Sequence, residues 1–583
     1  MSEYANLSLS DETNKIVEKR FVNLTEASSF ASAYLNRAVS TSNISYLIQY
    51  GRIKKFGRKG NILIDIEELR NYYNSVNILP YETYGAGNLN SAEQNIYRTK
   101  ENKENSNNYR INSEQFYARA QAEQRFNAQR NGQLSFSNYT ESERTKHVHR
   151  IHPYKGKFIP QLVEYFLDTH IDEFKKEAYF RKGDVVLDPF CGSGTTLVQS
   201  NELNLYAIGI EISPFNALIG NIKVGAHPLS EIRKSISDIT YKLTDFQKKK
   251  NNGRFIENLN RSLSKFNNKY FPSPEYKIKA REGGINEKEY GGQKEKEFLA
   301  EYERLVKEHN IEIINKKNGN DSFNGKWFLR PVKEEVDFIF GEIQKIENTD
   351  VKKVLAVILS RAMRSCRATT HADLATLKEP ILSPYYCKKH SKVCKPLFTI
   401  KDWWKTYAED TTLRLEEFQK LRTNTFQLCL CGDSRNLDIY TEVNKKNVHF
   451  YEILKNQKIR GVFSSPPYVG LIDYHEQHAY AYELFGFEKK DEMEIGSLSK
   501  GSGKKAREAY VKDISDVLIN SAKYLQEDHD IFLVANDKYN LYPEIVKLAG
   551  MKIVNRFNRP VLNRVEKDRG NIYSETIFHI KAK

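Results

Sequence analysis

The chain of 583 residues contains only six cysteines, no long apolar run and no internal repeat. Six thiols in so long a chain do not make a disulfide framework, so reduced thiols or a metal site remain as their uses. No apolar run could span a bilayer, and the first residues, MSEYANLSLSDETNK, lack the apolar core of a signal peptide. These absences predict a cytoplasmic protein that is not inserted in a membrane.

Positive charge exceeds negative charge in this sequence. Lys and Arg number 90 against 75 Asp and Glu, which gives a formal net charge of +15 and an isoelectric point near 9.1. Such a surplus favours a polyanionic partner such as nucleic acid, although charge alone also fits many solvated surfaces. The length exceeds one ordinary core, so two or three domains are expected.

Residues 1–80 are predicted to form a small first unit. A helix is expected from Leu24, capped by Asn23 or Thr25, followed by a helix near 42–50, a β-ribbon around 62–66 and a closing helix over 65–73. This order of elements resembles the winged helix–turn–helix of excisionase-type DNA-binding domains. The resemblance implies DNA contacts from the second helix and the wing, by Ser42, Asn43, Arg52, Lys54 and Arg58. A helical protein-contact module is the alternative.

A polar linker is predicted over residues 81–145. Its composition is rich in Asn, Gln, Ser, Glu and Arg and has few aliphatic residues. Such a segment cannot bury enough apolar surface to offset the entropy lost on ordering. We therefore expect it to be flexible or partly helical.

From residue 147 onward short apolar strands alternate with helices. A strand over 185–188, a helix over 195–202, a strand over 206–211 and a helix over 214–222 predict the opening of a doubly wound parallel sheet. Strands resume only at 427–431, 461–464, 531–535, 552–557 and 576–580. The intervening residues 225–425 are mostly charged and contain amphipathic runs at 351–363 and 403–421. The fold class predicted is therefore α/β with a large, mainly helical insertion.

A glycine loop follows the first strand of this sheet. Residues without Cβ let the backbone approach a ligand, and the start of the next helix offers free amides to a carboxylate. Glu211 ends the second strand, where a carboxylate can accept hydrogen bonds from both hydroxyls of a ribose. A simple tight turn with a surface glutamate is the alternative. The loop residues are Asp188, Pro189, Phe190, Cys191, Gly192, Ser193, Gly194 and Thr195.

Ser465, Pro466, Pro467 and Tyr468 follow the strand that ends at residue 464. Two prolines cannot continue a ladder, so the chain leaves the sheet abruptly and the carbonyls of Ser465 and Pro466 can point into the crevice. Two acceptors aimed at a planar amine would favour a pyramidal nitrogen and free its lone pair, without a metal. Tyr468 offers a face on which an extruded base can stack. A proline-bearing loop is the alternative.

Together, the segments DPFCGSGTT, GIEISP and SPPY resemble the motifs of S-adenosylmethionine-dependent DNA amino-methyltransferases, which methylate an exocyclic nitrogen of cytosine or adenine. The resemblance implies a Rossmann-like methyltransferase sheet, with a cofactor half over 146–224 and a catalytic half over 426–583. It implies S-adenosyl-L-methionine in the glycine loop and on Glu211, and double-stranded DNA as substrate. The insertion over 225–425 would then recognise the target sequence.

Further segments extend the resemblance. HPYKGKFIP implies that Lys157 and Phe158 line the cofactor pocket, with a basic linker as the alternative. Asp433 follows the strand QLCLC and by resemblance lies near the adenine amino group of the cofactor, unless it only caps the next turn. Residues 472–475 continue the likeness to cytosine-N4 enzymes. Arg559 and Glu575 also look family-like, without a chemical role that the sequence assigns.

The base is indicated by one side chain. Members of this family commonly have serine at the position of Ser465 when they methylate cytosine N4, and Asp or Asn when they methylate adenine N6. We therefore predict a site-specific cytosine-N4 DNA methyltransferase, the modification enzyme of a restriction–modification system with a cognate endonuclease. The alternatives are an adenine-N6 enzyme, a DNA-binding regulator with an inactive methylase fold and an RNA-modifying enzyme.

One cysteine motif lies apart from these segments. Cys387, His390 and Cys394 have the spacing C-x2-H-x3-C in a Lys-rich part of the insertion, which suits a zinc corner. A fourth ligand is not obvious, although Cys366 or His371 could serve. Lone thiols in a loop are the alternative, so no metal is assigned.

Overall fold

The computed structural model describes two compact units, Met1–Glu114 and Gln115–Lys583. Among the helices it describes, none combines the length and apolar character that a bilayer crossing needs. The residues described are 21–34, 39, 41, 44, 47, 48, 53, 56, 63–75, 134–136, 139–154, 156, 158–250, 252–314, 322–371, 373, 377–473, 475–561 and 574–583.

The first unit is built on a short antiparallel pair. β1 (Phe21–Asn23) pairs with β2 (Leu63–Asp65), and each strand leads directly into a helix, α2 (Leu24–Tyr34) or α4 (Ile66–Ser75). Asn23 Oδ1 accepts hydrogen bonds from the backbone N–H groups of Thr25 and Glu26, at 2.9 and 3.0 Å, so Asn23 caps α2 and Thr25 does not. The apolar faces of α2 and α4 share one core with Ile44, Leu47 and Ile53.

The predicted DNA-contacting residues of this unit lie outside the described residues. These are Ser42, Asn43, Arg52, Lys54 and Arg58. Of the ribbon that the sequence predicts, the structure describes the antiparallel pairing of Phe56 with Leu63. The winged helix–turn–helix therefore stays a prediction.

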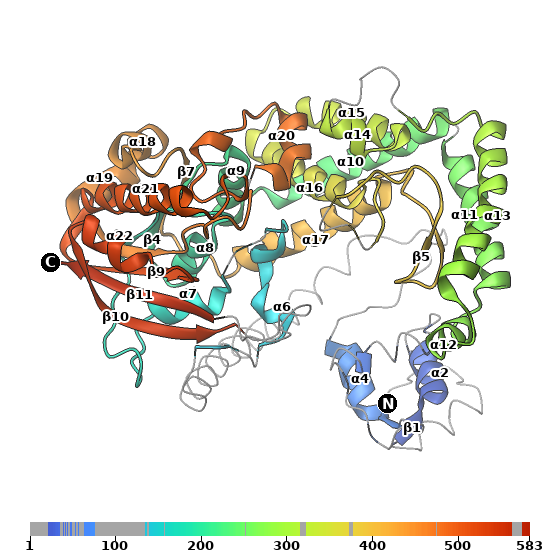
Figure 1. Cartoon of the computed structure of the whole chain (residues 1–583), viewed down its shortest axis with the longest axis horizontal. Coiled ribbons are helices and arrows are strands. Elements are labelled where there is room, and N and C mark those ends of the chain that lie inside the picture. The colour runs from blue at the N-terminus through green and yellow to red at the C-terminus, as the bar shows by residue number, and fades with distance from the viewer. Residues whose placement is uncertain are drawn as a thin grey trace, which may run out of the picture. The chain divides into compact units, whose positions relative to one another are not determined.

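The second unit contains a seven-stranded sheet in the order β10-β11-β9-β8-β3-β4-β7 (Figure 1). The pairs β9–β8, β8–β3, β3–β4 and β4–β7 are parallel, and β11 runs antiparallel to both of its neighbours. This confirms the predicted α/β class with a mostly parallel sheet. The strands are β3 (Val185–Asp188), β4 (Tyr206–Glu211), β7 (Gln427–Cys431), β8 (Ile459–Ser464), β9 (Leu525–Ala535), β10 (Met551–Pro560) and β11 (Ser574–Ala582).

Both faces of the sheet are buried, because successive strand side chains point to opposite sides. Val186 of β3 belongs to one apolar cluster, with α7 (Pro160–Leu167), α8 (Thr195–Glu202) and α9 (Pro214–Val224). Its neighbours Val185 and Leu187 belong to another. The helices of that second cluster are α18 (Ile439–Lys446), α19 (Val448–Gln457), α21 (Lys504–Ala522) and α22 (Tyr542–Leu548).

The direction of strand order reverses between β3 and β8. From β3 the chain proceeds to β4 and β7 on one side, and then continues with β8 and β9 on the other. Val186 pairs with Gly461 and Leu187 with Val462 in this junction. In open α/β sheets ligands bind outside the carboxyl ends of the strands at such a reversal.

The insertion separates β4 and α9 from β7 and is mainly helical, as predicted. Its apolar residues Leu355, Ile358 and Trp404 join the cluster on one sheet face, so the insertion and the sheet share a core. A short hairpin within it was not predicted. Its elements, green to yellow in Figure 1, are α10 (Leu229–Lys249), α11 (Asn252–Tyr270), α12 (Glu275–Arg281), α13 (Glu287–Glu308), α14 (Phe323–Trp327), α15 (Arg330–Gln344), α16 (Thr349–Ser365), β5 (Tyr385–Cys387), β6 (Lys392–Cys394) and α17 (Lys401–Gln419).

Short helices connect the remaining segments. Before the sheet these are α6 (Glu141–Arg144) and η1 (His147–Arg150). Between β8 and α21 they are η2 (Glu476–His478), α20 (Ala479–Phe485), η3 (Asp491–Met493) and η4 (Leu498–Lys500). The long connection after β8 therefore contains several short helices, and it comes back to the carboxyl edge of the sheet.

Candidate active site

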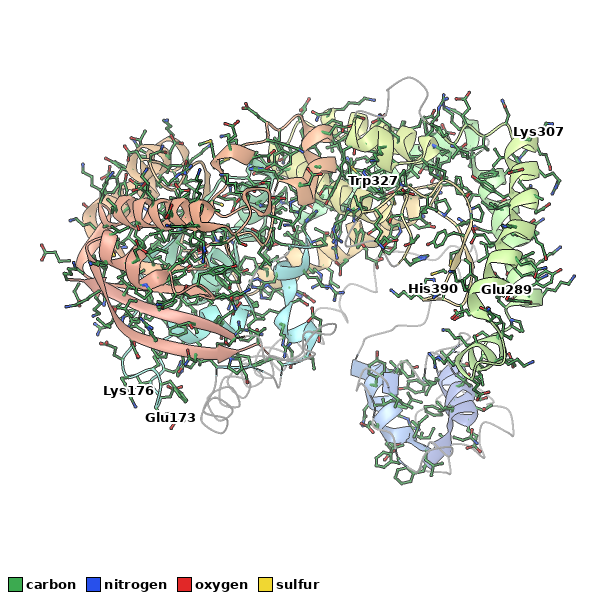
Figure 2. The ribbon with its side chains drawn as sticks, viewed as in Figure 1. Glu173, Lys176, Glu289, Lys307, Trp327 and His390 are labelled. Atoms are coloured by element: carbon green, nitrogen blue, oxygen red, sulfur yellow. The ribbon has the colours of Figure 1, made fainter. Side chains whose placement is uncertain are left out.

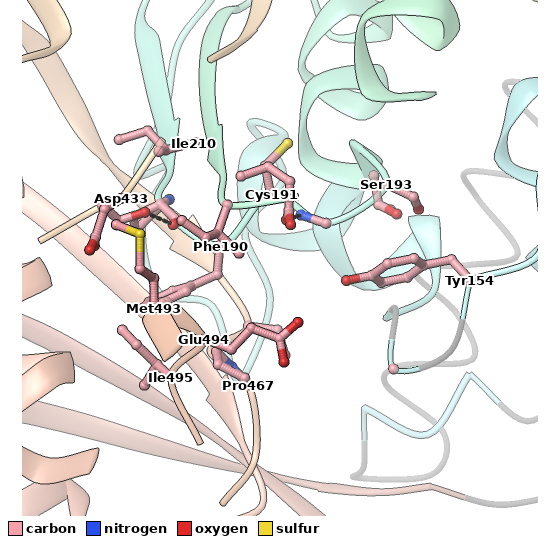
Figure 3. Close-up of a pocket in the computed structure, with 18 of the residues that line it drawn as sticks. Tyr154, Phe190, Cys191, Ser193, Ile210, Asp433, Pro467, Met493, Glu494 and Ile495 are labelled. Carbon is pink, nitrogen blue, oxygen red and sulfur yellow. Dashed lines mark hydrogen bonds between the residues drawn. The ribbon is translucent and has the colours of Figure 1, made fainter. Parts of the chain in front are cut away.

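An open cavity lies where β3, β4, β7 and β8 end, at the reversal of strand order. Its empty space, including the mouth, is about 790 Å³ (Figure 3). The structure therefore brings the glycine loop and the proline loop to one site, although they are far apart in sequence. Of the residues that the sequence predicted, those lining the cavity are Phe158, Pro189, Phe190, Cys191, Gly192, Ser193, Thr195, Glu211, Asp433, Ser465 and Pro467.

The glycine loop has a backbone that only glycine fits. Gly192 and Gly194 have φ angles of 52° and 79°, in the left-handed region that side chains disfavour. A Cβ on Gly192 would approach the Tyr154 hydroxyl to 2.9 Å, and one on Gly194 would approach Gly220 Cα to 3.0 Å. Gly194 also forms the N-cap of α8. The loop thus wraps tightly around the start of the helix beside the cavity.

Glu211 is a buried carboxylate at the end of β4. Its Oε2 accepts a hydrogen bond from the Gly192 N–H at 2.8 Å, and its Oε1 accepts from the Ser213 N–H at 3.0 Å. Burial raises the pKa of Glu211 to about 7, while hydrogen bonds from Ser213, Asn216 and Gly192 oppose that rise. Oε1 also accepts a longer bond of 3.4 Å from Asn216 Nδ2, so Oε2 keeps a lone pair for a hydroxyl in the cavity and Oε1 can accept a second hydroxyl in place of the Asn216 bond.

Two hydroxyl groups in the same cavity have unsatisfied hydrogen-bonding capacity. Ser193 Oγ and Thr195 Oγ1 are buried and have no hydrogen-bond partner among the residues that the structure describes. Buried polar groups normally have partners, so orphaned hydroxyls beside a cavity are suited to a polar ligand. The carbonyl of Ser193 is occupied, since it accepts a hydrogen bond from Lys223 Nζ at 2.6 Å.

Asp188 does not line the cavity. Its Oδ1 accepts hydrogen bonds from Ser464 Oγ at 2.5 Å and from the Phe190 N–H at 3.2 Å, and burial raises its pKa to about 6. Asp433 does line the cavity, and Arg435 pairs with its carboxylate at 2.6 Å and with Asp513 at 2.8 Å. Both aspartates are therefore fixed by neighbouring side chains.

Ser465 and Pro467 line the cavity, whereas Pro466 and Tyr468 do not. The Pro467 carbonyl accepts a hydrogen bond from Tyr510 Oη at 2.9 Å. Tyr468 Oη donates to Glu575 Oε1 at 2.9 Å. Glu575 in turn pairs with Arg559 of β10 at 2.5 Å, so these two residues hold the phenol end of Tyr468.

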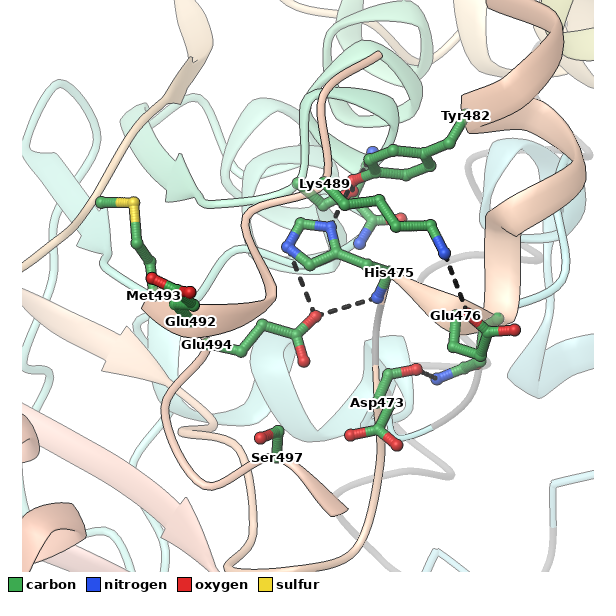
Figure 4. A network of polar contacts seen from close by, with 12 residues as sticks. Asp473, His475, Glu476, Tyr482, Lys489, Glu492, Met493, Glu494 and Ser497 are labelled. Atoms are coloured by element: carbon green, nitrogen blue, oxygen red, sulfur yellow. Dashed lines mark hydrogen bonds and ion pairs between the residues drawn. The ribbon is translucent and has the colours of Figure 1, made fainter. Parts of the chain in front are cut away.

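Sequence reasoning missed a polar chain beside the cavity (Figure 4). His475 N–H donates to Glu494 Oε1 at 2.9 Å, and His475 Nδ1 lies 2.6 Å from Tyr482 Oη. Tyr482 Oη lies 2.6 Å from Ser213 Oγ, two residues after Glu211. Burial lowers the pKa of His475, which favours the neutral imidazole. This series of polar contacts therefore joins the loop after β8 to the loop after β4.

Further cavity residues were also not singled out as site residues, among them Tyr154, Met493, Glu494 and Ile495. Tyr154 belongs to the HPYKGKFIP segment, whereas the other three lie in and just after η3, within irregular chain that carries no motif. Lys157, the remaining cofactor residue that the sequence predicted, lies outside the described residues.

A second cleft adjoins this cavity. Its empty space is about 1270 Å³, and Tyr154 lines both spaces. Its lining includes Arg364 in the last turn of α16, Arg367 just after that helix, and Ile472 and Asp473 a few residues after the proline loop. Burial lowers the pKa of Arg367 to about 10, so the side chain stays charged at neutral pH. The insertion thus contributes cationic groups to a cleft that borders the cavity.

The candidate zinc residues lie in the insertion and line neither space. Cys387, His390 and Cys394 come together there with His371, whereas Cys366 has its Sγ 4.0 Å from the Thr399 carbonyl. The fourth member of the group is therefore His371 and not Cys366.

Comparison with known proteins gives a consistent result. A family model described as DNA methylase matches residues 38–220. The type II methyltransferase M.MjaII of Methanocaldococcus jannaschii is 42% identical over 565 residues, which are 97% of this chain and 97% of that protein. The type II methyltransferase M.MvaI of Kocuria varians is 32% identical over 115 residues, 20% of this chain and 23% of that protein.

Among solved structures, this chain shows only a weak likeness to a methyltransferase. It is the rRNA methyltransferase aviRa from Streptomyces viridochromogenes, with a TM-score of 0.27 and 9% identity over 76% of this chain and 94% of that chain. A likeness this weak has no bearing on the fold or the activity.

Proposed function

Because this chain belongs to the type II DNA methyltransferases of the N6/N4 DNA methylase family, we propose that it methylates the exocyclic N4 of cytosine at a specific site in double-stranded DNA. The observation that carries this proposal is the single cavity shared by Gly192, Glu211, Ser465 and Pro467. A methyl donor on the first two residues and a base beside the other two would meet within it.

The cavity suits S-adenosyl-L-methionine, which the family implies. Glu211 offers two acceptor oxygens for ribose hydroxyls, and the orphaned hydroxyls of Ser193 and Thr195 offer hydrogen bonds to the amino-acid end. Phe158 and Phe190 supply apolar surface, and Asp433 offers an acceptor for the adenine amino group. When bound, the cofactor supplies an electrophilic methyl group on a sulfonium.

The proline loop would activate the amine. β8 ends at Ser464, and Tyr510 already occupies the Pro467 carbonyl, which leaves the carbonyls of Ser465 and Pro466 as the acceptors for the amine hydrogens. Two acceptors aimed at these hydrogens would favour a pyramidal nitrogen and free its lone pair for the methyl group. The new N–C bond would replace the S–C bond of the cofactor, and one amine proton would pass to water. The hydrogen bond from Tyr468 to Glu575 would hold the aromatic face on which the extruded base stacks.

The base would arrive from the adjoining cleft. Arg364 and Arg367 place positive charge on its insertion side, where phosphates of a bent or opened strand can bind. Residues 225–425 would read the sequence, helped by phosphate and base contacts of the N-terminal unit. A cognate restriction endonuclease would act on the same site when the DNA lacks the modification.

The choice of cytosine N4 rests on serine at position 465. The test is mass spectrometry of nucleosides from duplex DNA after incubation with the full chain and S-adenosylmethionine. We expect N4-methylcytosine. N6-methyladenine instead would show an adenine enzyme. Methyl transfer to RNA in preference to duplex DNA, or to no nucleic acid, would contradict the proposal as a whole.

A further inference from the structure

Four metal-ligating side chains meet in the insertion, in a place that the active site does not use. Cys387 ends β5, Cys394 ends β6, and His390 lies in the turn between them. His371 comes from the segment after α16. One ligand atom from each of the four lies within 4.8 Å of the others. Figure 2 labels His390, on the hairpin that packs against α13.

The separations within this group match those of a tetrahedral zinc site. Zn–S and Zn–N bonds of about 2.3 and 2.0–2.1 Å place neighbouring ligand atoms about 3.3–3.8 Å apart. Cys387 Sγ lies 3.8 Å from His371 Nδ1, and Cys394 Sγ lies 3.4 Å from His390 Nδ1. The rings of His371 and His390 are 4.3 Å apart between centroids. Little movement would be needed to coordinate a metal ion.

The hairpin turn is shaped to present its side chains to one point. The carbonyl of Cys387 accepts hydrogen bonds from the N–H groups of Ser391 at 2.7 Å and His390 at 3.1 Å. Ser391 has a φ of 52°, which closes the turn in the left-handed region. This local backbone brings Cys387, His390 and Cys394 to one side of the hairpin.

His371 is held independently. Its backbone N–H donates to Tyr385 Oη at 3.1 Å, and its Nδ1 lies 2.8 Å from the same oxygen. Because Nδ1 has a single lone pair, it can bind a metal only when the Tyr385 hydroxyl turns away from it, and the backbone bond to Tyr385 then still holds the residue. The tyrosine thus places a fourth ligand from a different segment beside the three from the hairpin.

We propose that His371, Cys387, His390 and Cys394 bind one Zn²⁺ as a structural site. Two thiolates and two imidazoles suit zinc in hardness and number, and four protein ligands leave no open position for catalysis. The site would be closed.

The role of this zinc is to fasten the segment after α16. The hairpin is bonded to α11 through Asn267, which pairs with both backbone groups of Val393 at 2.9 and 3.1 Å. It is bonded to α13 through the Tyr386 N–H, which donates to Glu295 at 2.7 Å. A metal that adds His371 to the hairpin would hold His371 in place four residues after Arg367, which lines the cleft. The zinc therefore supports the recognition insertion.

Another cluster of potential ligands in the described chain lacks this arrangement. His147, His149 and Glu202 also lie together, but Lys146 Nζ pairs with Glu202 at 2.6 Å. The ammonium group already supplies the positive charge that a cation would bring there. We therefore do not propose a metal ion at His147, His149 and Glu202.

The test is the zinc content of the full chain, purified without chelators and with its thiols kept reduced. We expect about one zinc per chain, and less than about a tenth of that in Cys387→Ser/Cys394→Ser. The matched control is Cys366→Ser/Cys431→Ser, which removes two cysteines outside the cluster and should keep the metal. Cobalt titration of the chelated wild-type chain should give the visible absorption bands of tetrahedral cobalt thiolate.

A wild-type chain with far less than one zinc would overturn the proposal, as would full zinc in Cys387→Ser/Cys394→Ser. If that variant fails to fold, the cobalt titration of the wild-type chain decides. A titration without the bands of tetrahedral cobalt would also overturn the zinc proposal. A disulfide between Cys387 and Cys394 in protein isolated under reducing conditions would also contradict zinc binding. None of these outcomes depends on which base is methylated.

Discussion

Ser464 Oγ donates a hydrogen bond of 2.5 Å to Asp188 Oδ1, joining the last residue of β8 to the last residue of β3. The glycine loop begins directly after one of these residues and the proline loop directly after the other. The bond therefore fixes the two loops against each other beside the proposed site of methyl transfer. Both side chains are almost completely buried.

Ser464→Ala should lower the free energy of unfolding by about 1–3 kcal/mol, because it leaves a buried carboxyl group with one donor fewer. Loss of that donor should also raise the pKa of Asp188 further above its value of about 6. Urea denaturation measures the first effect. The control is Ser521→Ala, which removes a buried hydroxyl bonded to the Val517 carbonyl at 2.8 Å. An equal loss of unfolding free energy in both variants would contradict a special role for the Asp188 bond.

Glu211→Gln should change how stability depends on pH. Burial raises the pKa of Glu211 from 4.5 to about 7, so the folded state holds this proton more tightly than the unfolded chain does. The resulting stabilisation is complete below the unfolded pKa and is lost as the pH rises through about 7. Without cofactor, the wild-type chain should therefore lose up to about 3 kcal/mol relative to the variant between about pH 4 and pH 8.

Denaturation of both proteins across this range measures that difference. A gap between wild type and Glu211→Gln that stays constant with pH would show that Glu211 titrates normally. The same variant should bind S-adenosylmethionine at least about tenfold more weakly, because an amide offers one acceptor in place of two. Calorimetry tests the affinity.

Tyr468→Phe and Tyr468→Ala separate the hydroxyl from the ring. Stacking of a base on an aromatic ring contributes about 1–3 kcal/mol, so the alanine variant should lose about ten- to a hundredfold in kcat/KM for DNA. The phenylalanine variant keeps the ring and loses the bond to Glu575, so it should retain most activity. Steady-state methylation assays measure both. Equal losses would mean that the hydroxyl, and not the aromatic face, matters.

Tyr482→Phe should weaken cofactor binding, although Tyr482 does not line the cavity. It removes the hydroxyl between His475 and Ser213, whose backbone N–H holds Glu211. We expect a rise in the dissociation constant of S-adenosylmethionine of about tenfold, equivalent to about 1.4 kcal/mol. Tyr480→Phe is the matched control, because that buried hydroxyl has a contact of only 3.5 Å, to His152. Equal effects in the two variants would point to general loosening.

Arg364→Ala should weaken DNA binding through the cleft. Loss of one phosphate contact lowers the slope of log affinity against log salt concentration by about 1. Arg304→Ala is the control, since Arg304 is exposed on α13 and pairs with Glu301 and Glu308. Fluorescence anisotropy at several salt concentrations gives both slopes. An unchanged slope for Arg364→Ala would remove this arginine from the DNA path.

The sheet could be predicted because its strands are apolar runs that end in recognisable turns. The predicted ends of β3, β4 and β7 agree with the structure to the residue. β5 and β6 were missed because strands of three residues give no periodic signal. The cap of α2 was ambiguous between Asn23 and Thr25, since both residue types favour that position.

The surroundings of the site were less predictable than its motifs. Glu494, His475 and Tyr482 meet Ser213 only because two long loops return to one edge of the sheet. The sequence left Cys366 and His371 as alternatives for the fourth ligand, because no ligand-spacing rule selects between residues 16 and 21 positions before Cys387. Such contacts depend on tertiary packing, which residue spacing does not encode.

The most direct test of the shared cavity is a crystal structure of the full chain with S-adenosylhomocysteine. We predict that its ribose hydroxyls contact Glu211 and that its sulfur faces the side of the cavity formed by Ser465 and Pro467. Cofactor product bound away from Glu211, or with its sulfur turned from the proline loop, would contradict the account.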